Sequence, residues 1–405
     1  MNIVMYKGNF NYGVVSYFVD ELVQVFRKRG HHVEIMDIVG LEIEEDKRGD
    51  ELELAKIFKI DESVDLVLTF NGVGFIGDNE LFHKFKVIFG ALLIDHPFHQ
   101  YERIVRTKPK NIFYSMYDEG AIATAEKYIN SENIFTHLMH GGSYAKNSYI
   151  KKEYDVVVIG GLDERYLNID NVVDQYIGDE LGKIAKKLYE KASKDYCKTL
   201  DEHLEGIIKD MVLPDELIKM DQFKEIIRYI YIQVDLRLRA KTRYESVLWL
   251  LKNDIQVNYF GNCENEELRK YRNFIYHGSI GYEEVLDVMA KSKIIIHDVP
   301  CFKNGSHERV FSAMLNGALV VANYNNYSYN IYQDGESIVF YDINNYQDMV
   351  DKVKYYLENE QERLRIANNA LEITSKYNTW ENRADEILRV YEIMRGMRNS
   401  KEEVV

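Results

Sequence analysis

The segment from Asn304 to Gly317, NGSHERVFSAMLNG, combines residue types that could bind a diphosphate and a sugar. Ser306 is a plausible N-cap for a helix that begins there, and the free N–H groups and dipole of a helix N-terminus favour phosphate. Arg309 could neutralise a diphosphate through two parallel hydrogen bonds, and Glu308 could accept hydrogen bonds from ribose or hexose hydroxyls. Gly317 predicts a left-handed end to this helix. The alternative is an ordinary capped helix with a solvated, charged first turn.

Other loops of the C-terminal half follow apolar runs and could line the same site. Gly160 and Gly161 would let the backbone approach a ligand closely, and Arg165 could then reach a pyrophosphate; a tight turn with a surface salt bridge is the alternative. The pair Gly261 and Asn262 and the lone His277 also stand at strand ends, where ligands bind in open α/β sheets. A structural hydrogen bond is the alternative reading of His277.

In the N-terminal half, the segment IDHPFHQY offers a base. Asp95 and His96 end an apolar run, and either could take the proton of a hydroxyl within hydrogen-bond reach. Capping of a turn by Asp95 is an equally good explanation, and His99 is a weaker candidate for the base. Other residues of this half could contact a ligand, with a connector or hinge role as the alternative: Asn9, Gly13, Asn71, Gly72 and His140.

Apolar runs alternate with helical patterns, which predicts an α/β fold with parallel sheets covered by helices. The expected strands are residues 2–6, 33–38, 64–70, 87–94, 111–115, 134–139, 154–159, 255–260, 274–276, 294–297, 319–322 and 337–340. We expect two Rossmann-like domains facing a cleft, residues 1–152 and 153–380. A charged helical insertion is expected at about 170–252, and a C-terminal helix, 381–405, that packs back on the first domain.

The composition argues against several other classes of protein. The 405 residues carry a formal net charge of −15, and no basic tract compensates locally, so a nucleic-acid partner is not expected. The three cysteines, Cys197, Cys263 and Cys301, show no metal-ligand spacing, and we expect no metal. No signal peptide and no uncharged apolar run of membrane-spanning length is recognisable. A cytoplasmic protein is the simplest expectation.

The chain resembles the group 1 glycosyltransferases, in particular the branch similar to spore-maturation (CgeB-like) glycosyltransferases. The residues that carry this resemblance are VNYFGN, YHGSIGYEEVLDVMAKSKI, NGSHERVFSAMLNGALVVANYN and DGESIVFYD, all in the last 150 residues or so. The resemblance implies the GT-B fold and metal-independent transfer of a sugar, without a cofactor, from a UDP-sugar or another nucleotide-hexose to a protein or glycan. It implies that the C-terminal domain binds the donor and the N-terminal domain mostly the acceptor. The donor-binding residues would be Arg309, Ser306, His307, Gly305, Asn304, Arg165, Gly161, Gly261, Asn262 and His277.

One position departs from this family pattern. Ser312 stands where retaining members often have a glutamate, so the stereochemistry stays open. Glu308 would orient ribose or sugar hydroxyls. If the enzyme inverts, Asp95 or His96 would assist the acceptor; if it retains, the donor phosphate would assist instead. A nucleotide-sugar epimerase and a non-catalytic sugar-nucleotide-binding protein are the alternative functions. The helical insertion could serve as a lid, an acceptor-recognition module or an oligomerisation surface.

Overall fold

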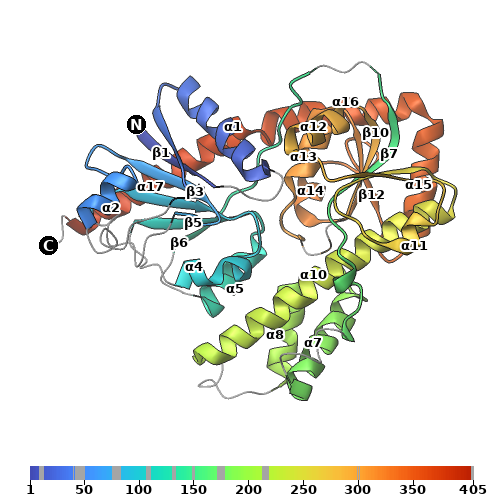
Figure 1. The fold of residues 1–405 in the computed structure, drawn as a ribbon, viewed down its shortest axis with the longest axis horizontal. Helices are drawn as coiled ribbons and strands as arrows, with labels where there is room; N and C mark the ends of the chain where they lie inside the picture. The colour runs from blue at the N-terminus through green and yellow to red at the C-terminus, as the bar shows by residue number, and fades with distance from the viewer. Residues whose placement is uncertain are drawn as a thin grey trace. The chain divides into compact units, whose positions relative to one another are not determined.

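The computed structural model describes residues 1–8, 13–39, 41, 51–74, 84–105, 111–129, 134–147, 151–170, 178–211, 219–298, 300 and 302–402. The chain forms two compact units. Unit 1 comprises Met1–Gly141 and Thr379–Val405, and unit 2 comprises Gly142–Asn378. Both are built from a parallel sheet with helices, as Figure 1 shows for each unit. The expected α/β class with two Rossmann-like parts is confirmed.

Unit 1 contains six strands in the order β2-β1-β3-β4-β5-β6, all parallel. The strands are β1 Asn2–Lys7, β2 His32–Asp37, β3 Leu66–Phe70, β4 Ile88–Leu92, β5 Ile112–Met116 and β6 Ile134–His137. Its α-helices are α1 Val14–Lys28, α2 Glu51–Ile57, α4 Tyr101–Val105, α5 Gly120–Tyr128 and α17 Trp380–Glu402, and η3 Pro97–Gln100 is a 3₁₀ turn. Strands β3, β4 and β5 are buried throughout, as expected for central strands of a parallel sheet.

Helix α1 shows how the sequence pattern produces this packing. Its apolar residues recur at helical spacing and are buried, and Gly30 at φ +84° follows the helix end, as predicted. Helix α17 comes from the end of the chain and packs on α1. Arg29 forms an ion pair with Asp385 at 2.5 Å, and the ring centroids of Phe18 and Trp380 lie 4.8 Å apart. The last helix is therefore part of unit 1.

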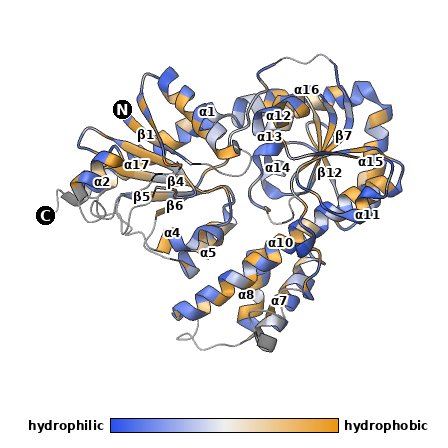
Figure 2. Ribbon diagram, viewed as in Figure 1, coloured by the Kyte–Doolittle hydropathy of each residue, from blue (hydrophilic) through white to orange (hydrophobic). Residues whose placement is uncertain are grey.

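Unit 2 contains the second six-stranded parallel sheet, in the order β12-β11-β10-β7-β8-β9. The strands are β7 Tyr154–Ile159, β8 Val257–Phe260, β9 Phe274–Gly278, β10 Ser292–His297, β11 Leu319–Asn323 and β12 Val339–Tyr341. Helices α11 Glu266–Arg269, α12 Tyr282–Ala290, α13 Glu308–Leu315, α14 Asn326–Ile331, α15 Tyr346–Glu358 and α16 Glu360–Tyr377 connect or follow them. Figure 2 shows the strands as largely hydrophobic and the helices as two-sided.

The strand order of unit 2 reverses between β7 and β10. The chain passes from β7 to β8 and β9 on one side, and then returns to β10 on the other side of β7. In open α/β sheets, ligands bind at such a switch point, beyond the carboxyl ends of the strands. The fold therefore places the candidate site at the ends of β7 and β10.

The expected helical insertion lies between β7 and β8. It consists of α7 Gly178–Ala192, α8 Leu200–Asp210 and the 32-residue α10 Asp221–Lys252, which pack on one another, after the 3₁₀ turn η4 Glu164–Tyr166 (Figure 1). Helix α8 begins with a capping box in which Thr199 and Glu202 exchange hydrogen bonds. The C-terminal part of α10 packs on β8 and α15 of unit 2.

The boundary between the units differs slightly from the sequence expectation at residue 152. Ser143 and Ala145 already belong to unit 2, because their backbone N–H groups donate to Ser312 Oγ (3.1 Å) and Asn316 Oδ1 (2.8 Å) of that unit.

Among the described residues, no helix is both long enough and apolar enough to span a membrane.

Candidate functional site

Two glycines bring the backbone segments that follow β7 and β8 into close contact beside the switch point. Gly160 follows β7 with φ +145°, and Gly261 follows β8 with φ +138°, values that side-chain-bearing residues rarely adopt. A Cβ atom on Gly261 would overlap the carbonyl oxygen of Gly160. The sequence motif at this turn thus reflects a real steric requirement for glycine.

Two guanidinium groups converge on Gly160 from different helices. Arg309, at the start of α13, donates to the carbonyl oxygen of Ile159, and Arg243, in α10, donates to that of Gly161 at 2.6 Å. A Cβ atom on Gly160 would lie 2.9 Å from Arg309 Nη1 and 3.0 Å from Arg243 Cζ. The missing side chain of Gly160 is therefore what lets both cations meet at the end of β7.

A buried aspartate balances part of this positive charge. Asp298 directly follows β10, is 3% exposed, and accepts a long hydrogen bond from Arg243 Nε at 3.4 Å. Its other oxygen, Oδ2, and the buried hydroxyl of Tyr259 have no hydrogen-bond partner among the described residues. Buried polar atoms without partners are uncommon and costly, so these two atoms are candidates to bind a ligand or a water molecule.

The pKa values of this cluster follow from its burial and charges. Burial raises the pKa of Asp298 despite the opposing effect of Arg243 and Arg309. For Arg243, burial would lower the pKa, but Asp298 and Tyr259 together outweigh burial and the pKa is raised. Burial, with the like charge of Arg243, lowers the pKa of Arg309. The pKa of His297 lies well below its ordinary value because the imidazole is buried and faces Arg309 and Arg243. A second anion is thus favoured near the two arginines.

The start of α13 differs from the sequence prediction in its cap. His307, not Ser306, is the N-cap residue: its Nδ1 accepts from the backbone N–H of Arg309 at 3.2 Å. Ser306 cannot serve, because the helix begins only at Glu308 and the Ser306 hydroxyl is buried against Ser328 Oγ at 3.5 Å. His307 also contacts the Glu308 carboxylate, and its Nε2 lies 3.0 Å from Arg309 Nη2. Gly317, at φ +68°, ends the helix as predicted.

The structure separates the other donor-side candidates from the arginine pair. The Arg165 guanidinium is 81% exposed and pairs with Asp163 at 2.5 Å, which is the surface salt bridge considered as its alternative. His277 Nε2 lies 3.0 Å from Asn258 Oδ1, and its ring stacks on Phe260 at 4.2 Å, so it has the structural role considered from the sequence. Asn262 is exposed, and its carbonyl accepts from Leu162 N–H. Gly305 and half-buried Asn304 lie in the loop before His307. Donor binding by these five residues, Arg165, His277, Asn262, Gly305 and Asn304, remains a prediction.

Ser312, the departure from the family pattern, is completely buried. Its hydroxyl accepts from the Ser143 N–H and lies 3.2 Å from the Tyr282 hydroxyl. Asn316 binds the same segment, donating to the Ser143 carbonyl at 3.0 Å. The position that a glutamate often occupies thus holds the segment after Gly142 against α13.

In unit 1, the candidate bases lie after β4. His96 is 5% exposed and caps η3, with Nδ1 accepting from the Phe98 N–H at 3.3 Å. Asp95 beside it is half-buried. Capping is therefore done by His96 rather than Asp95, and the role of either as a base remains a prediction.

The remaining unit 1 candidates have structural contacts. Asn71, at φ +53°, accepts from the Ile94 N–H at 3.0 Å through its side chain, which ties the β3 and β4 loops together, and Gly72 follows at φ +66°. Gly13, at φ +71°, precedes α1. Asn9 lies outside the described residues.

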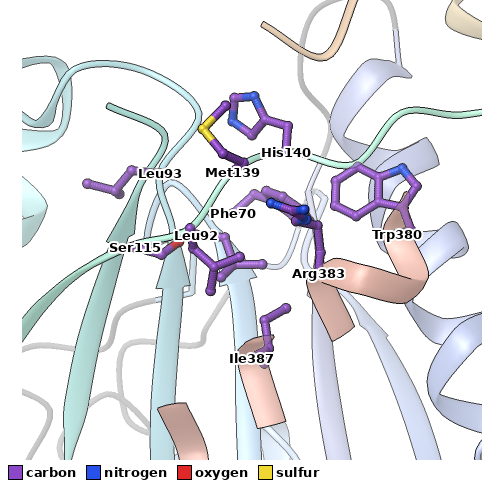
Figure 3. Close-up of a pocket in the computed structure, with 10 residues that line it drawn as sticks. Phe70, Leu92, Leu93, Ser115, Met139, His140, Trp380, Arg383 and Ile387 are labelled. Atoms are coloured by element: carbon purple, nitrogen blue, oxygen red, sulfur yellow. The ribbon is translucent and has the colours of Figure 1, made fainter. Parts of the chain in front are cut away.

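His140 lines a small cavity at the carboxyl edge of the unit 1 sheet. Figure 3 shows the cavity between the strand ends and the first turns of α17. Its volume of about 10 Å³ fits about one water molecule. The lining residues are Phe70, Leu92, Leu93, Ser115, Leu138, Met139, His140, Trp380, Arg383 and Ile387. His140 is buried between the rings of Tyr117 and Phe18, at 5.4 and 6.4 Å. This cavity is too small for a sugar.

Sequence reasoning missed Arg243 and Asp298. Asp298 follows a predicted strand directly, so the strand-end rule applied to every strand would have found it. Arg243 lies inside a long charged helix, and no local signal distinguishes it from the surface arginines nearby.

Within the described ranges, no group of three or more His, Cys, Asp or Glu residues is arranged to hold a metal ion.

Two parallel α/β units, the second with an arginine-lined glycine turn at its switch point, define a protein of the GT-B fold. Residues 243–389 match the protein family described as "Glycosyl transferase-like". No curated protein matches the chain.

Solved structures are similar over nearly the whole chain. One is HepE of Anabaena in complex with UDP and glucose, with a TM-score of 0.55, 11% identity, and coverage of 97% of this chain and 99% of that one. The sucrose-phosphate synthase of Thermosynechococcus elongatus gives a TM-score of 0.53 at 10% identity, covering 98% and 100%. An α-glucosyltransferase in complex with UDP-glucose and DNA containing an abasic site gives 0.54 at 12%, covering 97% and 99%. At these identities, the similarity establishes the fold.

Proposed function

We propose that this protein is a glycosyltransferase that transfers a hexose from a nucleotide-diphosphate sugar to a hydroxyl of a protein or glycan. The observation that carries the proposal is the meeting of Arg243 and Arg309 at Gly160. Two guanidinium groups and the N-terminus of α13 suit a diphosphate, whose two charged groups need several donors at once. The match of residues 243–389 to a glycosyl transferase-like family includes both arginines.

The chemistry assigned to these residues is stabilisation of a leaving group. As the bond between the sugar and the diphosphate breaks, negative charge grows on the phosphate oxygen. Fixed N–H donors in a partly buried site stabilise that charge without reorganisation. Arg243 is positioned for this by Asp298, whereas Arg309 is positioned by His307. Glu308 would orient a hydroxyl of the ribose or sugar, and Asp95 or His96 would serve as base if the enzyme inverts.

We further propose that the reaction needs neither a metal nor a cofactor, that the protein is cytoplasmic, and that it belongs to the spore-maturation branch. The two arginines supply the positive charge that a metal would otherwise give the leaving diphosphate. UDP-glucose is the first donor to test, because HepE and the α-glucosyltransferase are described with UDP or UDP-glucose bound.

The experiment is a thermal-shift screen against nucleotide sugars, followed by calorimetry with the best nucleotide diphosphate. A ligand at 100 times its Kd stabilises by about 2.7 kcal/mol, which is readily detected. Arg309→Met and Arg243→Met should each weaken binding, whereas Arg272→Met, in the exposed turn before β9, should leave it unchanged. Unchanged affinity in both site variants would overturn the proposal. Incubating the donor without an acceptor then separates an epimerase, which interconverts donor sugars, from a transferase.

A further inference from the structure

An exposed pair of tyrosines lies at the carboxyl edge of the unit 2 sheet. Tyr324 directly follows β11 and is 42% exposed, and Tyr329 in α14 is 57% exposed. Their ring centroids are 5.3 Å apart with planes inclined at 51°. Neighbouring exposed aromatic side chains of this kind commonly mark a binding surface.

The pair rests on the core of the unit. The Phe340 ring of β12 is 6% exposed and lies 5.6 Å from the Tyr324 ring and 6.5 Å from the Tyr329 ring. The buried phenylalanine therefore supports both tyrosines from the inner side. A supported ring loses little conformational freedom on binding, which favours a ligand that stacks on it.

The tyrosines are also tied to the loop that leads into α13. Asn326 donates through its backbone N–H to the Lys303 carbonyl at 2.6 Å and through its side chain to Asn304 Oδ1 at 2.9 Å. Buried Lys303 donates in turn to the Tyr324 carbonyl at 3.5 Å. Asn304 stands three residues before His307, so their Cα atoms are at most about 11 Å apart. The tyrosines are therefore connected by hydrogen bonds to the loop that leads into the arginine site.

The chemistry of this surface is neutral and amphipathic. Residues 324–330, YNNYSYN, contain no charged side chain in a chain of which 29% is charged. Asn326 and Asn330, which are close to the two tyrosines in sequence, are also exposed. Aromatic faces pack against the C–H face of a sugar ring, while amides and phenol hydroxyls exchange hydrogen bonds with its hydroxyl groups. The adjoining cation, Lys303, is buried and donates to the Tyr324 carbonyl, so the exposed surface formed by residues 324–330 presents an anionic nucleotide with no charged side chain of its own.

We propose that Tyr324 and Tyr329 form a binding platform for a neutral sugar residue of the acceptor. The assignment to the acceptor rests on the proposed transferase function. The donor diphosphate is assigned to the arginine pair, and the platform offers that charge nothing, so the second substrate is the ligand whose chemistry it fits. The acceptor class that follows is a glycan or glycoconjugate with an uncharged sugar near the accepting hydroxyl.

The test measures glycan binding without donor, so it does not depend on catalysis. An array of neutral oligosaccharides is probed with the wild-type protein and with Tyr324→Ala/Tyr329→Ala, and the glycans bound by wild type are titrated. The double variant should bind them about tenfold more weakly, the effect expected for losing two aromatic contacts. Tyr324→Phe/Tyr329→Phe should retain most of the affinity. Urea unfolding of each variant checks that unit 2 still folds.

The matched control is Tyr355→Ala. Tyr355 is 51% exposed and pairs with Tyr356 at 5.0 Å, but it lies near the end of α15, away from the residues that follow the strands. This variant should bind glycans as the wild type does. Absence of any neutral glycan ligand, or equal binding by the double variant, would overturn the platform. A loss of UDP affinity in the double variant would also overturn it and identify a nucleobase as the occupant. If UDP binds to neither form but glycan binding shows the expected loss, the platform stands and the transferase proposal fails.

Discussion

Gly160→Ala tests the arginine site with the smallest possible change. The new Cβ would lie 2.9 Å from Arg309 Nη1 and 3.0 Å from Arg243 Cζ, so at least one guanidinium group must move. A hydrogen bond from a charged group contributes about 1.5–3 kcal/mol, so losing one should weaken binding of a nucleotide diphosphate about 10- to 100-fold. The backbone at φ +145° adds strain of about 1–3 kcal/mol to the folded state.

A glycine outside the site, Gly206 in α8, supplies the control. A Cβ on Gly206 would meet no atom within 4 Å. Calorimetric titration with UDP should therefore give a wild-type Kd for Gly206→Ala, and urea unfolding should show which variant is destabilised. Wild-type affinity in a folded Gly160→Ala protein, or an equal loss in Gly206→Ala, would refute the assignment of the diphosphate to this turn.

Three further predictions concern pH and packing. The pKa of His297 is low in the folded state. Between the ordinary pKa of about 6.5 and that lower value, only the unfolded chain binds the proton. The free energy of unfolding therefore decreases as the pH is lowered through this range, by up to about 1.4 kcal/mol per pH unit. His297→Asn should remove this part of the slope when urea midpoints at pH 7.5 and 5.5 are compared. Ser312→Ala leaves the Ser143 N–H without its acceptor and removes the partner of the Tyr282 hydroxyl, so urea unfolding should show a loss of about 1–3 kcal/mol. Trp380→Ala opens the buried contact of α17 with α1 and should cost about 3–5 kcal/mol; a loss under 1 kcal/mol would mean that α17 does not stabilise unit 1.

The fold could be predicted from the sequence because the central strands of each sheet are buried on both faces. Such strands appear as continuous apolar runs, and each run predicted as a strand overlaps one of the twelve strands in the described part of the chain. Bounds shifted by a residue or two at the ends, as for the run 87–94, where β4 is Ile88–Leu92. The short helix α14 was missed because NYSYNI has no apolar periodicity, and its start depends on Asn325, whose side chain accepts from the Ser328 N–H.

The site could be predicted only where its residues are neighbours in the chain. Arg309 and the glycine turn were identified from local motifs, and the structure brings them together. The choice between Arg165 and Arg243 could not be made in this way. Arg165 is close to Gly160 in sequence, yet Asp163 two residues before it holds its guanidinium at the surface. Arg243 is remote in sequence and reaches Gly161 only because α10 passes over the end of β7.

This placement of Arg243 also bears on why the chain has a helical insertion. Asp235, Arg239 and Arg243 recur every four residues, so they lie on one face of α10. Arg239 pairs with Asp235 at 2.8 Å and lies 5.2 Å from the centre of the Phe302 ring, in the loop before α13. Arg243 reaches the glycine turn one helical turn further on. A helix that only connected β7 to β8 would need neither contact. Because α10 also packs on α7 and α8, the insertion orients the helix that carries one of the two site arginines.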